Sequence, residues 1–236
     1  MLLAHLLAAA LVVLFPLWDV WEARRLREAV RPGAKSPVYL RVIAVLWLFA
    51  FAVLLVFPLS SLFHAPRASG APWRELSPTT AWIIAAAAGA GQLLPVVFAR
   101  FDPGLRARLA AAFDEIGYLL PRTAREKLLF AGVSVTAGIT EELIYRGFLM
   151  RYLAAEPWGL SAVAALVVSS VAFGVAHAGQ GGRGMLLTGV LGLLMGGLYL
   201  ASGSLLLPIL LHTLIDLRAL AMAHLTRREA AGTAGP

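Results

Sequence analysis

Residues 38–62 read VYLRVIAVLWLFAFAVLLVFPLSSL, and this stretch decides the class of fold. It holds one charged side chain, Arg41, near its start. An apolar run of this length is typical of a membrane-crossing helix, because about 20 residues span the hydrocarbon core. Across the 236 residues, 60% are hydrophobic and 14% are charged, against about 45–50% and about 25% in soluble domains. The excess falls in long blocks, so we expect lipid-facing helices.

The charge pattern excludes other classes of protein. The net charge is +7, from 20 Lys and Arg against 13 Asp and Glu. The basic residues lie between the apolar blocks, as they do in membrane proteins, where they set the orientation. We therefore expect no nucleic-acid partner. The chain has no cysteine, which excludes disulfides, thiolate catalysis and cysteine-based metal sites.

The apolar blocks predict an all-α, polytopic transmembrane helix bundle of about seven spans. The first block lacks the basic start and the cleavage site of a signal peptide, so we interpret it as a retained helix. The mixed apolar and charged stretch 105–120 is typical of an amphipathic helix that lies along the membrane surface. The seven blocks cover residues 2–18, 38–62, 80–99, 128–153, 159–176, 185–201 and 205–223.

The positions of the basic residues predict an orientation in the membrane. The connectors 24–35 and 100–127 and the C-terminal tail are rich in arginine, and such segments stay in the cytoplasm. The loop 64–77 carries only Arg67 and Arg74. We expect an integral protein of the bacterial inner membrane, with its N-terminus outside and its C-terminus in the cytoplasm.

Ionisable side chains inside the spans concentrate in the C-terminal half of the chain. Each costs at least about 2.5–3.5 kcal/mol to insert into a membrane, so each is a functional candidate by default. These candidates are Glu141, Glu142, Arg146, His177, His212, Asp216 and Arg218.

The two adjacent glutamates have different helical neighbours. Residues four apart share a helix face, so Glu142 meets Arg146 and the two can neutralise each other. Glu141 lies about 100° around the helix, and its neighbour four residues on is Tyr145. Glu142 is thus a candidate for a structural role, and Glu141 is a candidate for catalysis. The alternative is a single buried ion-pair network that only fixes packing.

Two histidines follow on later spans. Phe173 and His177 share a face at the end of the fifth block, and His212 and Asp216 share a face of the seventh. A histidine beside a carboxylate is a common catalytic or metal-binding pair. The alternatives are an interfacial His177 and a structural polar contact for His212.

A carboxylate and a histidine in a wet cavity can together deprotonate water for attack on a peptide carbonyl. His212 can then stabilise the oxyanion. The H-E-x-x-H motif of zinc proteases is absent, and a serine mechanism would leave Glu141 unexplained. Zinc held by Glu141, His177 and His212 is a chemical alternative.

The three motifs, E-E-L-I-Y-R at 141–146, F-x-x-x-H at 173–177 and H-x-x-x-D at 212–216, resemble those of one family. It is the CAAX-protease and bacteriocin-processing (CPBP, or ABI) family of intramembrane glutamate proteases, which includes the type 2 CAAX prenyl endopeptidase. The resemblance covers residues 128–223. It implies a metal-independent protease without a cofactor, whose cavity opens to the cytoplasm. The implied domains are N-terminal membrane helices with basic connectors (1–127), a catalytic core (128–224) and a flexible tail (225–236).

The resemblance also implies a role for each residue. Glu141 and His177 would activate water, and His212 and Asp216 would form the oxyanion side. Glu142 and Arg146 would support the site, together with the neighbouring Tyr145 and Phe173. The family often has Asn where this chain has Asp216, and an ionised Asp cannot donate a hydrogen bond. Asp216 is therefore expected either to be protonated or to orient His212.

The depth of the residues sets a geometric condition. Glu141 lies about 20 Å into the fourth span at 1.5 Å per residue, whereas His177 lies at the end of the fifth span. The two side chains meet only if the fourth helix begins outside the lipid or tilts strongly.

Rival functions are a non-catalytic immunity or assembly factor and a proton-coupled transporter. The expected partners are membrane lipid and a peptide or membrane-protein substrate, and the sequence carries no signal for an oligomeric state.

Overall fold

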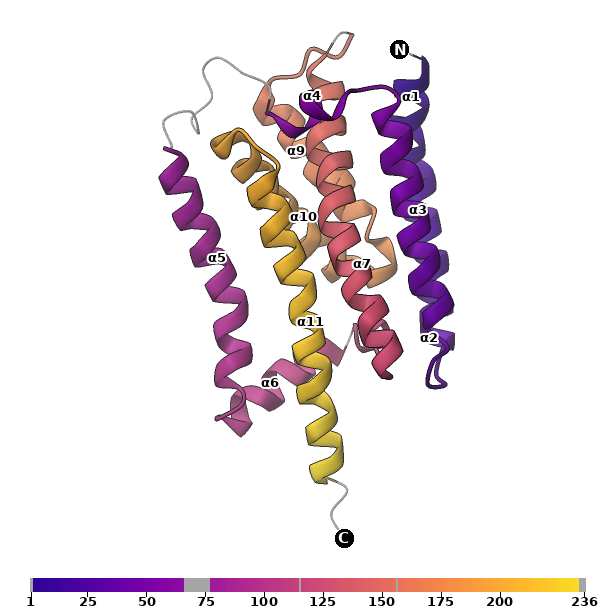
Figure 1. The fold of residues 1–236 in the computed structure, drawn as a ribbon, viewed down its shortest axis with the longest axis vertical. Helices are drawn as coiled ribbons and strands as arrows, with labels where there is room; N and C mark the ends of the chain where they lie inside the picture. Colours follow the sequence, from indigo (N-terminus) through magenta and orange to yellow (C-terminus); the bar gives the residue numbers. More distant parts are fainter. Residues whose placement is uncertain (1, 66–76, 115, 156, 234–236) are drawn as a thin grey trace.

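The chain folds into a bundle of helices that run roughly along its long dimension (Figure 1). This computed structural model describes residues 2–65, 77–114, 116–155 and 157–233. Within those ranges every regular element is helical, and the single β pairing is an isolated antiparallel bridge between His64 and Ser204. The predicted all-α fold is confirmed.

The first apolar block forms a longer helix than predicted. α1 (Leu2–Ala9), η1 (Ala10–Leu14) and α2 (Phe15–Glu28) make one continuous segment. η1 is a π-helical turn just before Pro16, which has no N–H to donate along the helix, and a widened turn accommodates it. The predicted span 2–18 was wrong at its C-terminal end, because neither proline nor glycine stands between Trp18 and Pro32.

The second block is divided into two helices. α3 (Ser36–Leu54) is followed by the short α4 (Leu59–Phe63). Between them Pro58 is extended, with φ −64° and ψ 145°, and a proline also disfavours helical backbone in the residue before it. The prediction of a single span over 38–62 was therefore wrong, and the membrane helix ends at Leu54.

The third block matches its prediction closely. α5 (Pro78–Phe98) starts after Ser77, whose hydroxyl accepts a hydrogen bond from the Thr80 N–H. α6 (Pro103–Asp114) and the short η3 (Gly117–Leu119) then occupy the predicted surface stretch. Figure 1 shows α6 running across the end of the bundle. That course agrees with an interfacial helix, and its position in the membrane stays a prediction.

The C-terminal half supplies the remaining helices. α7 (Ala124–Glu142), η4 (Leu143–Leu149) and α8 (Met150–Ala154) form one long segment, followed by α9 (Ala162–Val175), η5 (Ala178–Gln180), α10 (Gly181–Ser202) and α11 (Leu206–Thr233). α11 extends past the expected core limit at residue 224. The side chains from residue 222 onward, and all of residues 66–76 and 234–236, lie outside the described residues. The domain division and the flexible tail stay predictions.

Glycines let the functional helices approach one another closely. A Cβ on Gly138 of α7 would lie 3.0 Å from the backbone nitrogen of Thr213 on α11. A Cβ on Gly174 of α9 would lie 2.6 Å from the carbonyl oxygen of Met185 on α10. Real Cβ atoms do not tolerate such distances, so these two glycines set the spacing of the bundle.

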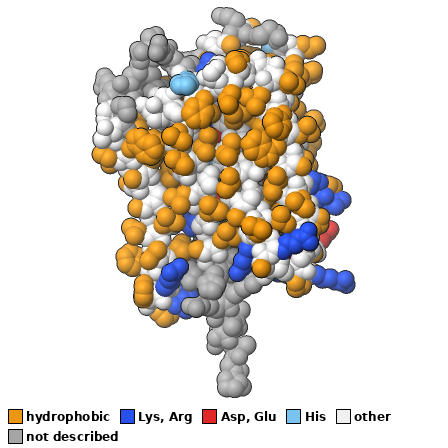
Figure 2. All heavy atoms as spheres, viewed as in Figure 1, with side chains coloured by type: hydrophobic (Ala, Val, Ile, Leu, Met, Phe, Trp, Pro, Cys, Tyr) orange, Lys and Arg blue, Asp and Glu red, His pale blue; other side chains and the backbone are white. Residues whose placement is uncertain are grey.

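The face of the bundle shown in Figure 2 is apolar over its middle and basic toward the end that carries α6. In the part of the chain that the structure describes, five helical segments are long and apolar enough to cross a membrane, and α9 is a shorter apolar helix. Together with α11 they correspond to the seven expected blocks. The chain is an integral membrane protein.

Candidate active site

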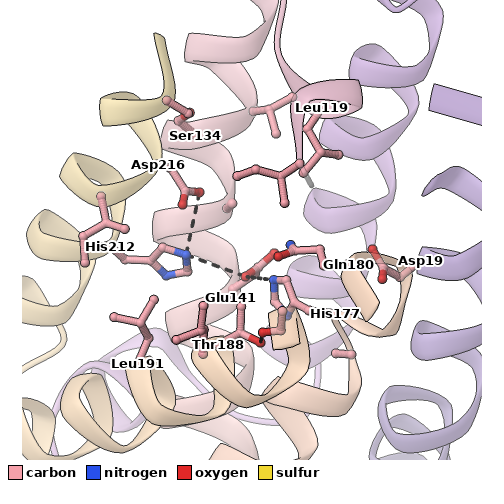
Figure 3. A pocket seen from close by; sticks show the side chains of 18 of the residues that line it. Asp19, Leu119, Ser134, Glu141, His177, Gln180, Thr188, Leu191, His212 and Asp216 are labelled. Carbon is pink, nitrogen blue, oxygen red and sulfur yellow. Dashed lines mark hydrogen bonds and ion pairs between the residues drawn. The ribbon is translucent and has the colours of Figure 1, made fainter. Parts of the chain in front are cut away.

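A cavity of about 690 Å³ lies inside the bundle. Its wall includes all four predicted catalytic residues, Glu141, His177, His212 and Asp216. Figure 3 shows the Glu141 carboxylate between the imidazole rings of His177 and His212. Residues from α7, the end of α9 and α11 thus meet in one place, as the sequence predicted.

Glu141 presents an unpartnered oxygen to both imidazoles. Its Oε2 atom is 3.9 Å from His177 Nε2 and 3.8 Å from His212 Nε2. This oxygen is buried and has no hydrogen-bond partner among the described residues. Polar atoms separated by more than 3.5 Å can be bridged by water. The three atoms can therefore bind one water molecule between them.

The start of α7 explains how Glu141 reaches His177. A capping box fixes this helix end, in which Thr123 accepts from the Glu126 N–H and Glu126 accepts from the Thr123 N–H. Glu126 also accepts from the N–H of Lys35, at 3.1 Å. α7 therefore begins beside the basic connectors, which supports the expectation that this helix starts outside the lipid.

Glu142 contacts both Arg146 and His212. Its Oε1 atom lies 3.0 Å from Arg146 Nη1 and 2.8 Å from His212 Nδ1. The expected pair with Arg146 is thus present and is almost completely buried. Because a carboxylate accepts, Nδ1 of His212 donates and Nε2 of the same ring is directed at Glu141. The sequence did not predict this second contact, since it joins two helices that are far apart in the chain.

His177 is held by the backbone of its own helix. Its Nδ1 atom lies 2.8 Å from the carbonyl oxygen of Phe173. A carbonyl accepts only, so this nitrogen carries a proton, and in the neutral ring Nε2 is a free acceptor. That free nitrogen is the one nearest Glu141.

Phe173 is the apolar centre of the site. Its ring lies 5.0 Å from that of Tyr145 and 4.7 Å from that of His177, both in edge-on contact. The Arg146 guanidinium lies 4.4 Å from the Phe173 centroid, a cation–π distance. The two aromatic support residues of the prediction therefore pack directly against the polar ones.

A π-helical segment begins directly after Glu142. η4 replaces the α-helical pattern over seven residues, and such segments are frequent at functional sites. The Ser169 hydroxyl donates to the carbonyl oxygen of Tyr145 within it, at 2.8 Å. The wider turn sets the directions of Tyr145 and Arg146 relative to the glutamates.

Asp216 lies at the more open side of the cavity. Its Oδ2 atom is 3.7 Å from His212 Nε2, and its side chain is 35% exposed. The hydrogen bond that fixes the His212 ring is the one that its Nδ1 donates to Glu142. Asp216 therefore contacts His212 as an ion pair at 3.7 Å and makes no hydrogen bond to it.

A comparison with known families gives a match to this region. Residues 123–218 match the family model described as type II CAAX prenyl endopeptidase Rce1-like. We call residues 123–218 the Rce1-like segment. The match begins at the cap of α7 and ends just after Asp216, so it includes every predicted site residue. Comparisons with curated proteins and with solved structures give no match.

The Rce1-like segment does not build the cavity alone. Asp19 of α2 also lines it, and its Oδ2 atom accepts a hydrogen bond of 2.6 Å from the Gly179 N–H. Asp19 was missed because the first predicted span ended at Trp18. The absence of proline and glycine between Trp18 and Pro32 is the signal that would have placed Asp19 inside the first long helix.

The zinc alternative has little geometric support. Among the residues that the structure describes, no group of three or more His, Cys, Asp and Glu side chains is spaced to hold a metal ion. Zinc binds nitrogen and oxygen ligands at about 2.0–2.2 Å, so Glu141 and the two imidazoles would have to move inward. The expectation of a cofactor-free site stays a prediction.

Proposed function

We propose that this protein is an intramembrane endopeptidase in which Glu141 and His177 activate the attacking water. The Rce1-like segment points to a peptidase. The observation that carries the mechanism is the unpartnered Glu141 oxygen between two imidazole nitrogens. A buried acceptor without a partner destabilises a fold, and this one lies on the cavity wall between two imidazole nitrogens, where a water molecule can bridge the three atoms.

In the proposed reaction, Glu141 accepts a proton from the water while the water oxygen attacks the peptide carbonyl carbon. Nε2 of His177 accepts the second hydrogen bond of that water and orients it. The C–N bond of the tetrahedral intermediate then breaks, and the proton held by Glu141 passes to the leaving amine. The products are one amine and one carboxylic acid, which keeps the second water proton until it releases that proton to solvent and becomes a carboxylate.

His212 supports the developing oxyanion. Its Nδ1 already donates to Glu142, so Nε2 donates as well only when the ring is an imidazolium. The carboxylates of Glu142 and Asp216 can balance that charge. Asp216 then acts by its charge near Nε2, at 3.7 Å, rather than as a hydrogen-bond donor.

Arg146 keeps Glu142 in place for this task. It donates to the Glu142 carboxylate and, from Nη2, to the carbonyl oxygen of Gly192 at 3.2 Å. Because Arg146 is bonded to both Glu142 and Gly192, it holds the Glu142 carboxylate in one orientation. That carboxylate in turn orients the His212 ring. Both residues are almost completely buried, so water does not compete for these contacts.

The family description supplies the first substrate class to test, a prenylated peptide ending in a CAAX sequence. The cavity lining includes Ala112 of α6 and Tyr118 of η3, both within the basic connector 100–127. If those connectors lie in the cytoplasm of the bacterial inner membrane, substrate enters from that side. Membrane lipid surrounds the remaining faces.

The test uses the purified full chain in lipid nanodiscs and an internally quenched farnesylated CAAX peptide. Glu141→Ala and His177→Ala are expected to abolish cleavage while the unfolding temperature stays close to the parent. Glu28→Gln, an acid-to-amide change on the exposed end of α2, is the matched control and keeps full activity.

Cleavage that survives both alanine substitutions overturns the mechanism, and a folded parent protein that leaves the peptide intact overturns the CAAX substrate class. A chelator arm separates the zinc alternative, since only a metal enzyme loses activity there and regains it with added zinc.

A further inference from the structure

The turn after His177 is fixed by three side chains from outside the Rce1-like segment. Asp19 Oδ2 accepts from the Gly179 N–H at 2.6 Å. The Gly179 carbonyl oxygen accepts from Arg27 Nη2 at 2.7 Å and from the Tyr118 hydroxyl at 3.0 Å. We call Asp19, Arg27 and Tyr118 the Gly179 anchor.

The anchor requires a glycine at its centre. A Cβ on residue 179 would lie 2.6 Å from the Ala23 Cβ atom and 2.8 Å from the Asp19 carbonyl oxygen. Gly179 is itself buried. Direct contact between the two backbones thus supplements the three hydrogen bonds, and η5 can dock on α2 only with glycine at this position.

The three anchor residues also hold one another. The Arg27 guanidinium lies 4.3 Å from the centroid of the Tyr118 ring, a cation–π contact. Burial raises the pKa of the Tyr118 hydroxyl above its ordinary value. The hydroxyl therefore stays protonated and remains a donor to Gly179 throughout the neutral range.

His177 depends on this turn for its direction. It follows the last residues of α9, and its backbone is not helical, with φ −102° and ψ 30°. Its carbonyl oxygen accepts from the Gln180 N–H at 3.0 Å, so His177 and Gly179 belong to one tight turn. Figure 3 shows Asp19 beside this turn, at the edge of the cavity that His177 enters.

We propose that Asp19 is a positioning residue for His177, which it holds at its working distance from Glu141 through the Gly179 N–H. This inference rests on the proposed function. A misplacement of about 1 Å in a catalytic group can lower a rate on the order of 100-fold. The anchor also gives the N-terminal helices a role in the reaction that the family match does not assign.

The experiment compares Asp19→Ala, Asp19→Asn and the control Glu28→Gln in the full chain in nanodiscs. Asparagine keeps an acceptor oxygen for the Gly179 N–H, whereas alanine removes it. Two quantities are measured: kcat and KM for the farnesylated CAAX peptide, and hydrogen–deuterium exchange of the backbone amides in the peptide that contains Gly179.

We expect Asp19→Ala to lower kcat by about tenfold to 100-fold with little change in KM, and to speed exchange at Gly179. Asp19→Asn should restore most of kcat and of the protection, and Glu28→Gln should match the parent. An unchanged kcat in Asp19→Ala, or an equal loss in Asp19→Asn, overturns the inference. Hydrogen–deuterium exchange needs no substrate, so it tests the Gly179 anchor separately from the protease mechanism. Unchanged exchange in Asp19→Ala refutes the anchor even if Glu141→Ala confirms the protease. Faster exchange in Asp19→Ala supports the anchor even if no peptide is cleaved.

Discussion

Nδ1 of His212 lies 2.8 Å from Oε1 of Glu142, and the same oxygen carries the ion pair with Arg146. One carboxylate oxygen therefore links the structural part of the site to an imidazole that faces the cavity. The two adjacent glutamates therefore differ in their contacts. Oε1 of Glu142 has two partners, whereas Oε2 of Glu141 has no hydrogen-bond partner among the described residues and faces two imidazoles, which supports the proposed use of Glu141 as the base.

Glu142→Leu should destabilise the protein strongly. It leaves the buried Arg146 without its carboxylate, and breaking a buried pair in this way costs about 3–5 kcal/mol. The double variant Glu142→Leu/Arg146→Met should recover much of the unfolding temperature, because no uncompensated charge remains. Peptide cleavage should stay low in both, since His212 has lost its acceptor. Recovery of cleavage in the double variant would show that His212 needs no support from Glu142.

Glu141→Gln should separate stability from activity. The substitution keeps the shape of the side chain and removes the base, so cleavage should fall by about 10²–10⁴-fold. The unfolding temperature should stay equal or rise, because the native Oε2 has no hydrogen-bond partner among the described residues. Differential scanning fluorimetry in detergent measures this, and a clear drop in the unfolding temperature would assign Glu141 a structural role.

Asp216→Asn should be tolerated. Asn has the same shape, and the residue makes no hydrogen bond to His212 at 3.7 Å, so we expect kcat to stay within about tenfold of the parent, the effect of roughly 1.4 kcal/mol. Asp216→Leu should lose more, because it removes the charge and both carboxylate oxygens from the cavity lining. Equal activity in the Leu variant would remove Asp216 from the site.

Gly138→Ala should disturb the site from a distance. The added methyl would meet the backbone of Thr213, which follows His212 directly, so α7 and α11 must separate. Gly197→Ala in α10 is the matched control, because nothing lies within 4 Å of a Cβ there and alanine favours a helix by about 1 kcal/mol over glycine. We expect a lower unfolding temperature and slower cleavage for Gly138→Ala only.

The orientation in the membrane can be checked with single cysteines, because the natural chain has none. Ser60→Cys in α4 should react with a membrane-impermeant maleimide on intact cells. Arg31→Cys, in the basic connector after α2, should react only after the membrane is permeabilised. The reverse pattern would place the arginine-rich connectors outside and the cavity mouth with them.

The sequence predicted the helical class, the blocks and the meeting of Glu141, His177, His212 and Asp216. The helical class and the blocks depend on a local signal, namely apolar run length, whereas the meeting of the four residues was expected from the resemblance of their motifs to one family. The contact between Glu142 and His212 escaped prediction, because helical spacing says nothing about which face of a distant helix lies opposite. The π-helical segment η4 escaped for a related reason, since its residues are equally compatible with an α-helix.

The boundaries were predicted less well than the elements. Pro58 indicates a helix break, but the predicted span 38–62 ran through it because the residues on both sides are apolar. The first span was ended at Trp18, although the polar residues after it continue the same helix. Because that span ended too early, Asp19 was not predicted as a site residue. The contact between the N-terminal helices and the site was missed for the same reason.

The Gly179 anchor joins residues that are made at very different times. Asp19 and Gly179 are 160 positions apart, which at about 5–20 residues per second is roughly 10–30 s of translation. During that interval α2 is already in the membrane without the turn that it will hold. The proposed site can therefore assemble only after the later helices have been made, because His177, Gly179 and His212 all follow α2 in the chain.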